Sequence, residues 1–360
     1  MPTPQQPTTH FLRDILRQPT ELRRTLDHLS KTGRGSLDAA VVAVRAARHV
    51  YLTGIGSSWH AGLNVSTLFQ LGARPVYLVD AAELVQFAAI PAGSVLIVIS
   101  RSGRSVEIVQ LLAKARESGA TVIGITNAAD GTLAREAQIP LVIPVALDHA
   151  ISVNTYITLA AAAGIVASSV VGSFDAALAA SLARSIAEAG RAIPRWQAQI
   201  EKSEWLAPHS TSYFLARGSS LGSAYEARLM SEEGVKSPAT AMGTGSFRHG
   251  PQEIVGKDVR FGLWIDGAKT RTQDLAVARD LRQLGARVML IGQRLPEDAG
   301  DLVFQLPEIA SEWQFLIDII PAQLVAERLA RLSGVDPDTF RLCSFVVEEE
   351  SGLLPPTKGA

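Results

Sequence analysis

From about residue 49 onward, short apolar runs alternate with longer segments whose apolar residues recur at helical spacing. In the first half this pattern predicts five strands, at His49–Thr53, Pro75–Val79, Ser94–Ser100, Thr121–Thr126 and Pro140–Ile143. Helical patterns fill the gaps, at Ser57–Leu71, Ala81–Ala89, Ser105–Ser118 and Thr132–Gln138. Strands that alternate with helices of this length are typical of a doubly wound α/β fold, in which a mainly parallel sheet is covered on both faces.

The same alternation begins again after a long helical zone at about Thr155–Trp205. Its alanine-rich stretch, Tyr156–Val171, is shorter than a typical membrane span, so we predict a buried helix. The second half then predicts strands at Thr211–Ala216, Arg260–Ile265, Arg287–Ile291 and Leu302–Gln305, with helices at Leu221–Gly234, Gln273–Leu284 and Ile317–Leu332. One further helix is predicted near the N-terminus, at Phe11–Lys31, behind a loose arm rich in Pro, Gln and Thr.

The two halves resemble each other in sequence. The segments VYLTGIGSSWHAG (Val50–Gly62) and YFLARGSSLGSA (Tyr213–Ala224) both place Gly-Ser-Ser between an apolar strand and a helix. We interpret this as an internal duplication. The predicted domains are residues 35–172 and 209–340, joined by a helical linker at 173–208. An N-terminal arm and helix (1–34) precede them and a C-terminal tail (341–360) follows them.

The glycine-rich turn at Gly54-Ile55-Gly56 could belong to a dinucleotide-binding motif, and the next strand is followed by an acid, Asp80. Trp59, however, occupies the place of the third glycine, where a bulky ring prevents the close packing that the motif needs. Ser57 and Ser58 instead offer hydroxyl groups at a helix N-terminus, which suit a sugar or a phosphate. A plain helix cap is the alternative for a single serine.

A second polar turn follows the strand that ends at Ser100. Ser102 and Ser105 continue it into the next helix, and in parallel sheets ligands bind at this edge. Unpaired N–H groups at a helix N-terminus favour an anion, and Gly103 permits a tight bend.

Two arginines stand in this turn, Arg101 and Arg104, and each could add a charge-assisted contact to an anion. The alternative is a capped turn with solvated charges. Ser152, which precedes another helix, is a third candidate contributor. Two hydroxyl-rich turns in one sheet favour a phosphate cradle over simple capping.

The second half contributes two candidates for acid–base chemistry. Glu233 lies next to Glu232 at a helix C-terminus, where a carboxylate is unfavourable unless it is solvated or has a function. His249 stands in the segment Ser246-Phe247-Arg248-His249-Gly250-Pro251, and a histidine before Gly-Pro is ordinarily a turn residue. If the two side chains converge on a sugar, they could transfer protons.

The composition of the chain limits which classes of binding partner are expected. The chain has 360 residues, 47% of them hydrophobic and 19% charged, with a formal net charge of −1. No bulk attraction to nucleic acid or an anionic membrane follows from that charge, so anion binding must be local. The one cysteine, Cys343, excludes an internal disulfide framework, and no metal-ligand spacing appears. The N-terminus has no secretory signal pattern, so we expect a cytoplasmic location. Because metal-ligand spacing is absent and the dinucleotide motif is broken, we expect no metal or redox cofactor.

Five segments resemble a known family. They are LRDILRQPTELRRTL (Leu12–Leu26), GIGSSWHAG, SRSGRSVE, SFRHGPQEIV and PAQLVAERLARLSGVDPDTFR (Pro321–Arg341). Together they are similar to the SIS (sugar isomerase) domains, and most closely to the isomerase half of the glutamine–fructose-6-phosphate aminotransferases, over nearly the whole chain. The resemblance implies an enzyme that acts on a sugar phosphate.

When the family's functional residues are matched to positions of this sequence, the resemblance implies a role for each candidate site residue. The serines that should hold the phosphate or the sugar are Ser57, Ser58, Ser100, Ser102 and Ser105. Arg101 replaces a glutamine of the family and adds a cation there. Glu233 falls on the catalytic glutamate that moves a proton between C1 and C2. His249 falls on the residue implied in ring opening, which in the family reaches the neighbouring subunit's site and so implies a homodimer.

Two lysines of the family are replaced. Met230 stands three residues before Glu233, and Cys343 stands at the tail lysine that forms a Schiff base in the aminotransferases; the nearest tail lysine is Lys358. A thiol cannot supply the amine for a Schiff base, and no N-terminal cysteine nucleophile is present to release ammonia from glutamine. We therefore expect isomerisation or deamination of a hexose 6-phosphate. The alternative is a non-catalytic sugar-phosphate sensor.

Overall fold

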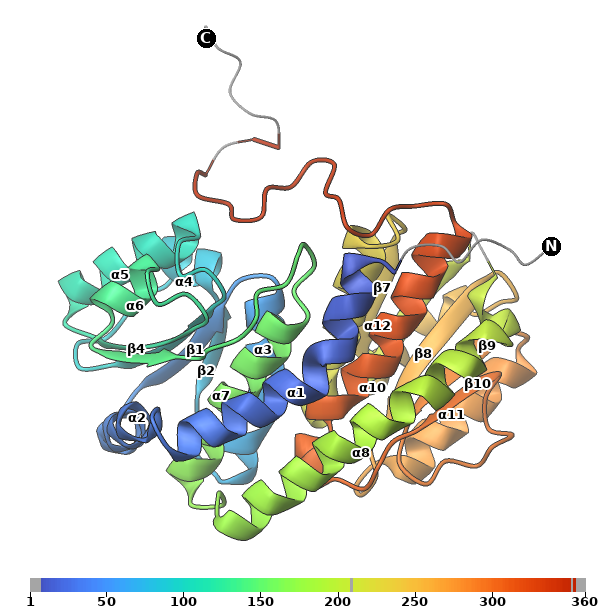
Figure 1. The fold of residues 1–360 in the computed structure, drawn as a ribbon, viewed down its shortest axis with the longest axis horizontal. Helices are drawn as coiled ribbons and strands as arrows, with labels where there is room; N and C mark the ends of the chain where they lie inside the picture. Colours follow the sequence, from blue (N-terminus) through green and yellow to red (C-terminus); the bar gives the residue numbers. More distant parts are fainter. Residues whose placement is uncertain (1–7, 208–209, 351, 354–360) are drawn as a thin grey trace, which may run out of the picture.

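The computed structural model describes residues 8–207, 210–350 and 352–353, and it contains two five-stranded parallel sheets (Figure 1). The first sheet has the order β2-β1-β3-β4-β5. Its strands are β1 (Val50–Gly54), β2 (Tyr77–Asp80), β3 (Val95–Ser100), β4 (Thr121–Thr126) and β5 (Ile139–Val142). All five predicted strands are present, with bounds that differ by two residues at most. The predicted α/β class is confirmed.

The second sheet has the order β10-β9-β8-β6-β7. Its strands are β6 (Thr211–Ala216), β7 (Ala239–Gly243), β8 (Val259–Ile265), β9 (Arg287–Gly292) and β10 (Leu302–Gln305). Numbered from its own first strand, this is the order of the first sheet, as a duplication would produce. Strand β7 was not predicted, because its sequence Ala-Thr-Ala-Met-Gly has weak strand propensity; it forms by pairing with β6 alone at the sheet edge.

Helices cover both sheets. The first half contains α1 (His10–Ser30), α2 (Arg34–Ala46), α3 (Ser57–Leu71), α4 (Ala81–Phe87), α5 (Val106–Ser118), α6 (Thr132–Glu136) and α7 (Asn154–Val171). The remainder contains α8 (Ala176–Glu201), α9 (Leu221–Glu233), α10 (Thr244–Phe247), α11 (Arg271–Gln283) and α12 (Phe315–Leu332). The predicted helices are present, whereas α2 and the short α10 were not predicted. The loose arm predicted at the N-terminus falls mainly outside the described residues, as does Lys358.

One hydrophobic core runs through both halves, and α7 lies in its centre. This helix is long and apolar enough to cross a membrane, but 89% of it is buried inside the fold, as the sequence analysis predicted. Residues of α1, α8 and α12 pack into the same core, while smaller clusters cover the outer face of each sheet. Beyond α12 the chain crosses the top of the molecule toward the first half (Figure 1).

Helices α3 and α9 meet at very close range where the halves join. A Cβ atom added to Gly222, in the first turn of α9, would lie 2.2 Å from the backbone oxygen of His60 and 2.3 Å from Asn64 Oδ1 on α3. Asn64 Oδ1 also accepts a hydrogen bond from the Ser223 N–H at 3.1 Å. Only a glycine fits between the two helices here, so this residue sets how near the second half comes to the turn after β1.

We predict that Gly222→Ala lowers the free energy of unfolding by about 2 kcal/mol or more, because the backbone of α3 must move to admit the methyl group. Urea unfolding followed by circular dichroism measures the change. Gly35→Ala is the matched control, since a Cβ atom there meets nothing within 4 Å. The control should be neutral or up to about 1 kcal/mol more stable, as alanine favours helix. Equal stabilities of the two variants would contradict the proposed contact.

Candidate active site

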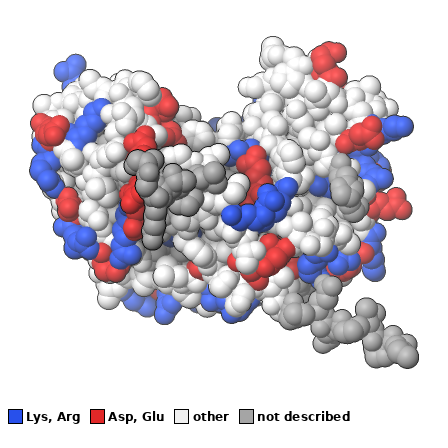
Figure 2. All heavy atoms as spheres, turned by 90° about the horizontal axis from the view of Figure 1, so that it is seen from above, with Lys and Arg blue, Asp and Glu red and all other residues white. Residues whose placement is uncertain are grey.

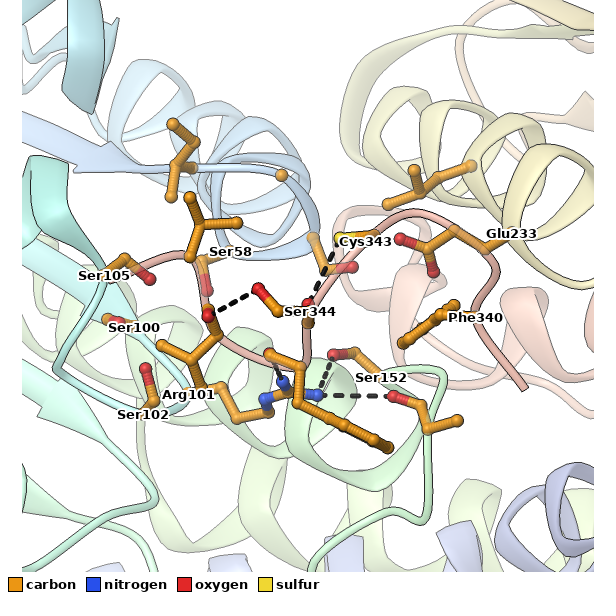
Figure 3. A pocket seen from close by; sticks show the side chains of 18 of the residues that line it. Ser58, Ser100, Arg101, Ser102, Ser105, Ser152, Glu233, Phe340, Cys343 and Ser344 are labelled. Carbon is orange, nitrogen blue, oxygen red and sulfur yellow. Dashed lines mark hydrogen bonds between the residues drawn. The ribbon is translucent and has the colours of Figure 1, made fainter. Parts of the chain in front are cut away.

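The strand order places the candidate site at one point of the first sheet. Strands β1 and β3 are neighbours there, and the chain connections leave them toward opposite faces of the sheet, which is the usual ligand position in such folds. A cavity of about 270 Å³ lies beside their carboxyl ends (Figure 3). It is lined by Ile55–Ser58, Ser100–Ser102, Ser105, Glu107, Ala150, Ser152, Leu229, Glu233, Phe340 and Cys343–Val347.

All seven predicted binding residues line this cavity. Ser57 and Ser58 come from the turn after β1, and the turn after β3 supplies Ser100, Arg101, Ser102 and Ser105, with Ser152 ahead of α7. Figure 3 shows Ser58, Ser100, Ser102 and Ser105 on one side of the cavity and Glu233 on the opposite side. Their roles toward a ligand remain predictions.

Hydrogen bonds within the chain hold the turn after β3 in shape. Ser100 Oγ accepts from the Gly103 N–H at 3.1 Å, and Ser102 Oγ accepts from the Arg104 N–H at 3.2 Å. Gly103 has a φ of +61°, and a Cβ atom there would lie 2.9 Å from the Leu133 Cβ. Both the left-handed backbone and the close packing require glycine at this position. The loop is therefore a fixed structure that presents hydroxyl groups to the cavity.

Two helices begin at the cavity. Helix α3 starts at Ser57, after Gly56 in a left-handed conformation (φ of +56°), and α5 starts after Ser105, which makes no side-chain capping bond. The first N–H of α5, on Val106, donates instead to the Val347 carbonyl of the tail at 3.0 Å. The positive ends of two helix dipoles meet at this cavity and suit an anion.

The two arginines of the loop have different surroundings. Arg104 pairs with Asp130 at 2.5 Å, with both side chains well exposed (42% and 80%), so it is a solvated charge that does not line the cavity. Arg101 lines the cavity and donates to Ser152 Oγ at 3.1 Å, to the Ala150 carbonyl at 3.4 Å and to the Phe345 carbonyl. Among the described residues that line the cavity, Arg101 is the one Lys or Arg side chain.

Electrostatic attraction at the cavity is therefore a local property. Seen from above, positive and negative side chains are interspersed over the surface rather than gathered by sign (Figure 2). This agrees with the net charge of −1. An anion would be held by Arg101, the helix N-termini and the hydroxyl groups, since no broad field directs it there.

Glu233 ends α9 on the opposite wall. Burial raises its pKa from 4.5 to about 7, with a further rise from the charge of Glu226, whereas Arg101 and Lys236 act in the opposite direction. A carboxyl group with a pKa near neutrality can exchange protons readily at neutral pH. Burial and the Glu233 charge also raise the pKa of the Cys343 thiol, which lines the same cavity.

Two other predicted features lie elsewhere. His249 is exposed after α10 and does not line the cavity, so the described chain does not bring it to Glu233. Met230 is fully buried in the core. Cys343, whose access to the site could not be judged from the sequence, lies at the cavity. Within the described part of the chain, no group of three or more His, Cys, Asp or Glu side chains gathers as metal ligands would.

In the corresponding turn of the second half, the serine side chains form hydrogen bonds with other residues of the chain. Ser219 Oγ donates to the Ser311 carbonyl at 3.0 Å, and Ser220 Oγ donates to Asp318 Oδ2 at 2.6 Å. Both serines are nearly inaccessible. The repeated Gly-Ser-Ser motif therefore has a structural use in the second half, while its copy in the first half opens onto the cavity.

Several lining residues were missed by the sequence analysis. The segment after α12 contributes Phe340 and residues 344–347, and α9 contributes Leu229. An irregular tail has no periodicity that would place it over a given turn. One signal was available on α9, where Glu226 and Glu233 are seven residues apart and so share a helix face.

Comparison with known proteins agrees with the resemblance found in the motifs. Residues 43–167 match the SIS domain. The glutamine–fructose-6-phosphate aminotransferase of Symbiobacterium thermophilum is 28% identical over 351 residues, which cover 92% of this chain and 58% of that protein. The chain thus spans little more than half the length of this relative.

Solved structures show the same fold. The C-terminal domain of glucosamine-fructose-6-phosphate aminotransferase from Francisella tularensis matches 93% of this chain and 99% of that domain, with a TM-score of 0.81 and 21% identity. Glucosamine-6-phosphate deaminase from Thermotoga maritima matches 94% of this chain and 99% of its own, with a TM-score of 0.79 and 21% identity. At this identity the likeness concerns the fold alone.

We predict that the double substitution Ser102→Ala and Ser105→Ala weakens the binding of inorganic phosphate at least about tenfold, because two hydroxyl donors to an anion are lost. Isothermal titration calorimetry measures the affinity. Ser118→Ala, at the far end of α5, is the control and should bind as the wild type does. Unchanged affinity in the double variant would refute an anion cradle at this turn.

We also predict that Glu233→Gln stabilises the fold at pH 8 but not at pH 4.5. The folded-state pKa of Glu233 is raised to about 7, so ionising this group costs the folded state free energy as the pH rises through that value. Glutamine stays neutral and avoids that cost, by roughly 1–2 kcal/mol for a half-buried group. Urea unfolding at the two pH values measures the difference. A gain of the same size at both would show that ionisation is not its cause.

Proposed function

Because residues 43–167 of this chain match the SIS domain, we propose that the chain is an enzyme acting on a hexose 6-phosphate. The reaction is aldose–ketose isomerisation, or the related deamination and isomerisation of an amino-sugar phosphate. The observation that carries this proposal is the placement of Glu233, with its raised pKa, across one cavity from the serine cradle. One wall suits a phosphate and the other a proton transfer.

In the proposed reaction the serine turns hold the phosphate, and the open-chain sugar extends toward Glu233. The Glu233 carboxylate removes the proton from C2 of the aldose, and O1 gains a proton as the enediol or enolamine forms. The hydroxyl or amino group on C2 then gives up a proton, and Glu233 returns its proton to C1. Binding energy from the phosphate orients carbons that do not themselves touch the cradle. A base with a pKa near 7 is matched to such a transfer at neutral pH.

An amino-sugar phosphate, such as glucosamine 6-phosphate, is the substrate to test first. With an amino group on C2, the same proton transfer leads through the enolamine to a ketimine, which water hydrolyses to fructose 6-phosphate and ammonia. Met230 is apolar and Cys343 is a thiol, so neither supplies a lysine amine beside Glu233, which disfavours Schiff-base transfer from the protein. The structural neighbour from Thermotoga maritima is named as a glucosamine-6-phosphate deaminase.

The proposed role of His249 in ring opening requires a second copy of the chain. It is exposed and lies away from the cavity of its own chain, so a role in ring opening requires the site of a partner in a homodimer. We propose this arrangement together with a cytoplasmic location for a metabolic enzyme. A non-catalytic sugar-phosphate sensor is the second candidate function, favoured by the replacement of both family lysines by Met230 and Cys343.

The test is proton exchange in deuterated water, followed by NMR with fructose 6-phosphate, glucosamine 6-phosphate and their galacto and N-acetyl analogues. The exchanging proton is on C1 of a ketose and on C2 of an aldose or amino sugar. Wild-type protein should exchange this proton in at least one sugar, with activity that falls below about pH 7 as Glu233 becomes protonated. Glu233→Gln should slow exchange about a thousandfold, within the usual range for loss of a catalytic base.

Glu232→Gln is the matched control, because Glu232 is the adjacent carboxylate but pairs with Arg228 at the surface at 2.9 Å. It should retain activity within about twofold of the wild type, as exposed ion pairs contribute little. Exchange that survives Glu233→Gln would overturn the assigned base. If a sugar phosphate binds tightly but none of the tested sugars exchanges its proton, the result would favour the non-catalytic sensor over the enzyme.

A further inference from the structure

Glu226 is a fully buried carboxylate on α9, two helical turns before Glu233, and the proposed mechanism does not use it. Its two oxygens face helix α3 of the other half. Oε1 accepts from the Ser57 hydroxyl at 2.9 Å, and Oε2 lies 2.7 Å from His60 Nδ1. His60 is itself only 3% exposed. These bonds join residues that are at least 166 positions apart in the sequence.

Such a carboxylate needs compensation for its burial. An ionised group removed from water destabilises the fold by several kcal/mol unless hydrogen-bond donors or opposite charge replace the water. Here one donor is a histidine of the other half and the second is a serine of the candidate cradle. The requirement of Glu226 for donors therefore fixes the orientation of a side chain that lines the cavity.

The consequence for Ser57 follows from the chemistry of a hydroxyl group, which has one proton to donate and two lone pairs that accept. The proton of Ser57 is directed to Glu226 Oε1, so the lone pairs remain for the cavity. We propose that Glu226, held by His60, is a positioning residue of this site, which makes Ser57 an acceptor for a sugar hydroxyl and supplies negative charge behind Glu233. This inference rests on the proposed function and deepens it.

Ser57 would thus differ in role from the serines that face the phosphate. A phosphate is itself an acceptor of hydrogen bonds and gains nothing from a hydroxyl that can only accept. Ser105, by contrast, makes no capping bond with its side chain and can turn its proton toward an anion. Ser57 therefore recognises the hydroxyl-bearing carbons of the sugar, and the turn after β3 recognises the phosphate.

The electrostatics of the opposite wall agree with this geometry. The Glu226 charge raises the pKa of Glu233, second only to burial. The other groups that face Glu233 are Arg101 from the turn after β3, Lys236 after α9, Glu232 on α9 and Cys343 from the tail. Around Glu226 itself are Ser57 and His60 of α3 and Tyr156 of α7, whose pKa is raised by burial and by the Glu226 charge. Removal of the Glu226 charge must therefore lower the pKa of Glu233.

The first experiment measures that effect without turnover. Protein labelled with ¹³C at the glutamate carboxyl is titrated by NMR, and the Glu233 signal is assigned from its loss in Glu233→Gln. In Glu226→Gln the Glu233 midpoint should move to lower pH by about half a unit or more. Glu232→Gln is the control and should move it less than Glu226→Gln does, because the Glu232 charge has the smallest of the named effects on this pKa. An unmoved midpoint in Glu226→Gln would overturn the electrostatic part of the inference.

The second experiment leaves Glu226 intact and compares Ser57→Ala with Ser57→Thr. Ser57→Ala should weaken glucosamine 6-phosphate binding about tenfold, which is one lost hydrogen bond, while the affinity for inorganic phosphate stays within about twofold. Ser57→Thr retains the hydroxyl group and should restore sugar binding. Equal losses for the sugar phosphate and for inorganic phosphate would show that Ser57 binds the phosphate as the other serines do, and would overturn the assigned role.

The outcomes separate this inference from the proposed function. If the wild type binds no sugar phosphate, the proposed function fails and the role of Ser57 toward a sugar fails with it. The NMR titration still decides, in that case, whether Glu226 sets the proton affinity of Glu233. If sugars bind and exchange but neither Glu226→Gln nor Ser57→Ala has its stated effect, the proposed function stands and the positioning role is refuted.

Discussion

The close contact between α3 and α9 is the constraint on which the candidate site depends. Gly222 brings the start of α9 against the backbone of α3, and one turn later Glu226 takes hydrogen bonds from Ser57 and His60. Two turns beyond Glu226, the same helix ends at Glu233 beside the cavity. The distance from the serine turn of one half to the carboxylate of the other is therefore determined by a buried helix pair. Neither half contains the complete site.

The two halves use the same architecture for different purposes. Their sheets have equivalent strand orders, and each places a glycine with a φ of +56° before a pair of serines. In the second half, Asp318 is buried among donors from Ser220 and Ser223; burial raises its pKa to about 7 although those donors lower it. This cluster satisfies the polar groups of the second turn within the fold. In the first half, by contrast, Ser57 and Ser58 line the cavity, so the same motif faces the candidate ligand site there.

The sequence predicted much of this arrangement because its signals are local. Alternating strands and helices imply parallel sheets, and parallel sheets bring the turns after β1 and β3 to one edge, so Ser58 and Ser102 could be placed together from their positions alone. Other features depend on contacts between distant residues. The edge strand β7 forms against β6 despite its alanines and glycine, and the bond between His60 and Glu226 has no spacing pattern that periodicity could detect. The course of the tail over the cavity is set by tertiary contacts as well.

The tail also changes what the cradle can offer to an anion. The first N–H of α5 donates to the Val347 carbonyl, and Arg101 donates to the carbonyl of Phe345, so two of the strongest donors at the cavity are already paired. Donors in such a place must be satisfied by some acceptor, because leaving them unpaired costs about 1–3 kcal/mol each. A phosphate that uses the same donors must compete with the tail for them. Its affinity is then the difference between two sets of hydrogen bonds, and the tail, which carries Cys343, is energetically coupled to the ligand that it covers.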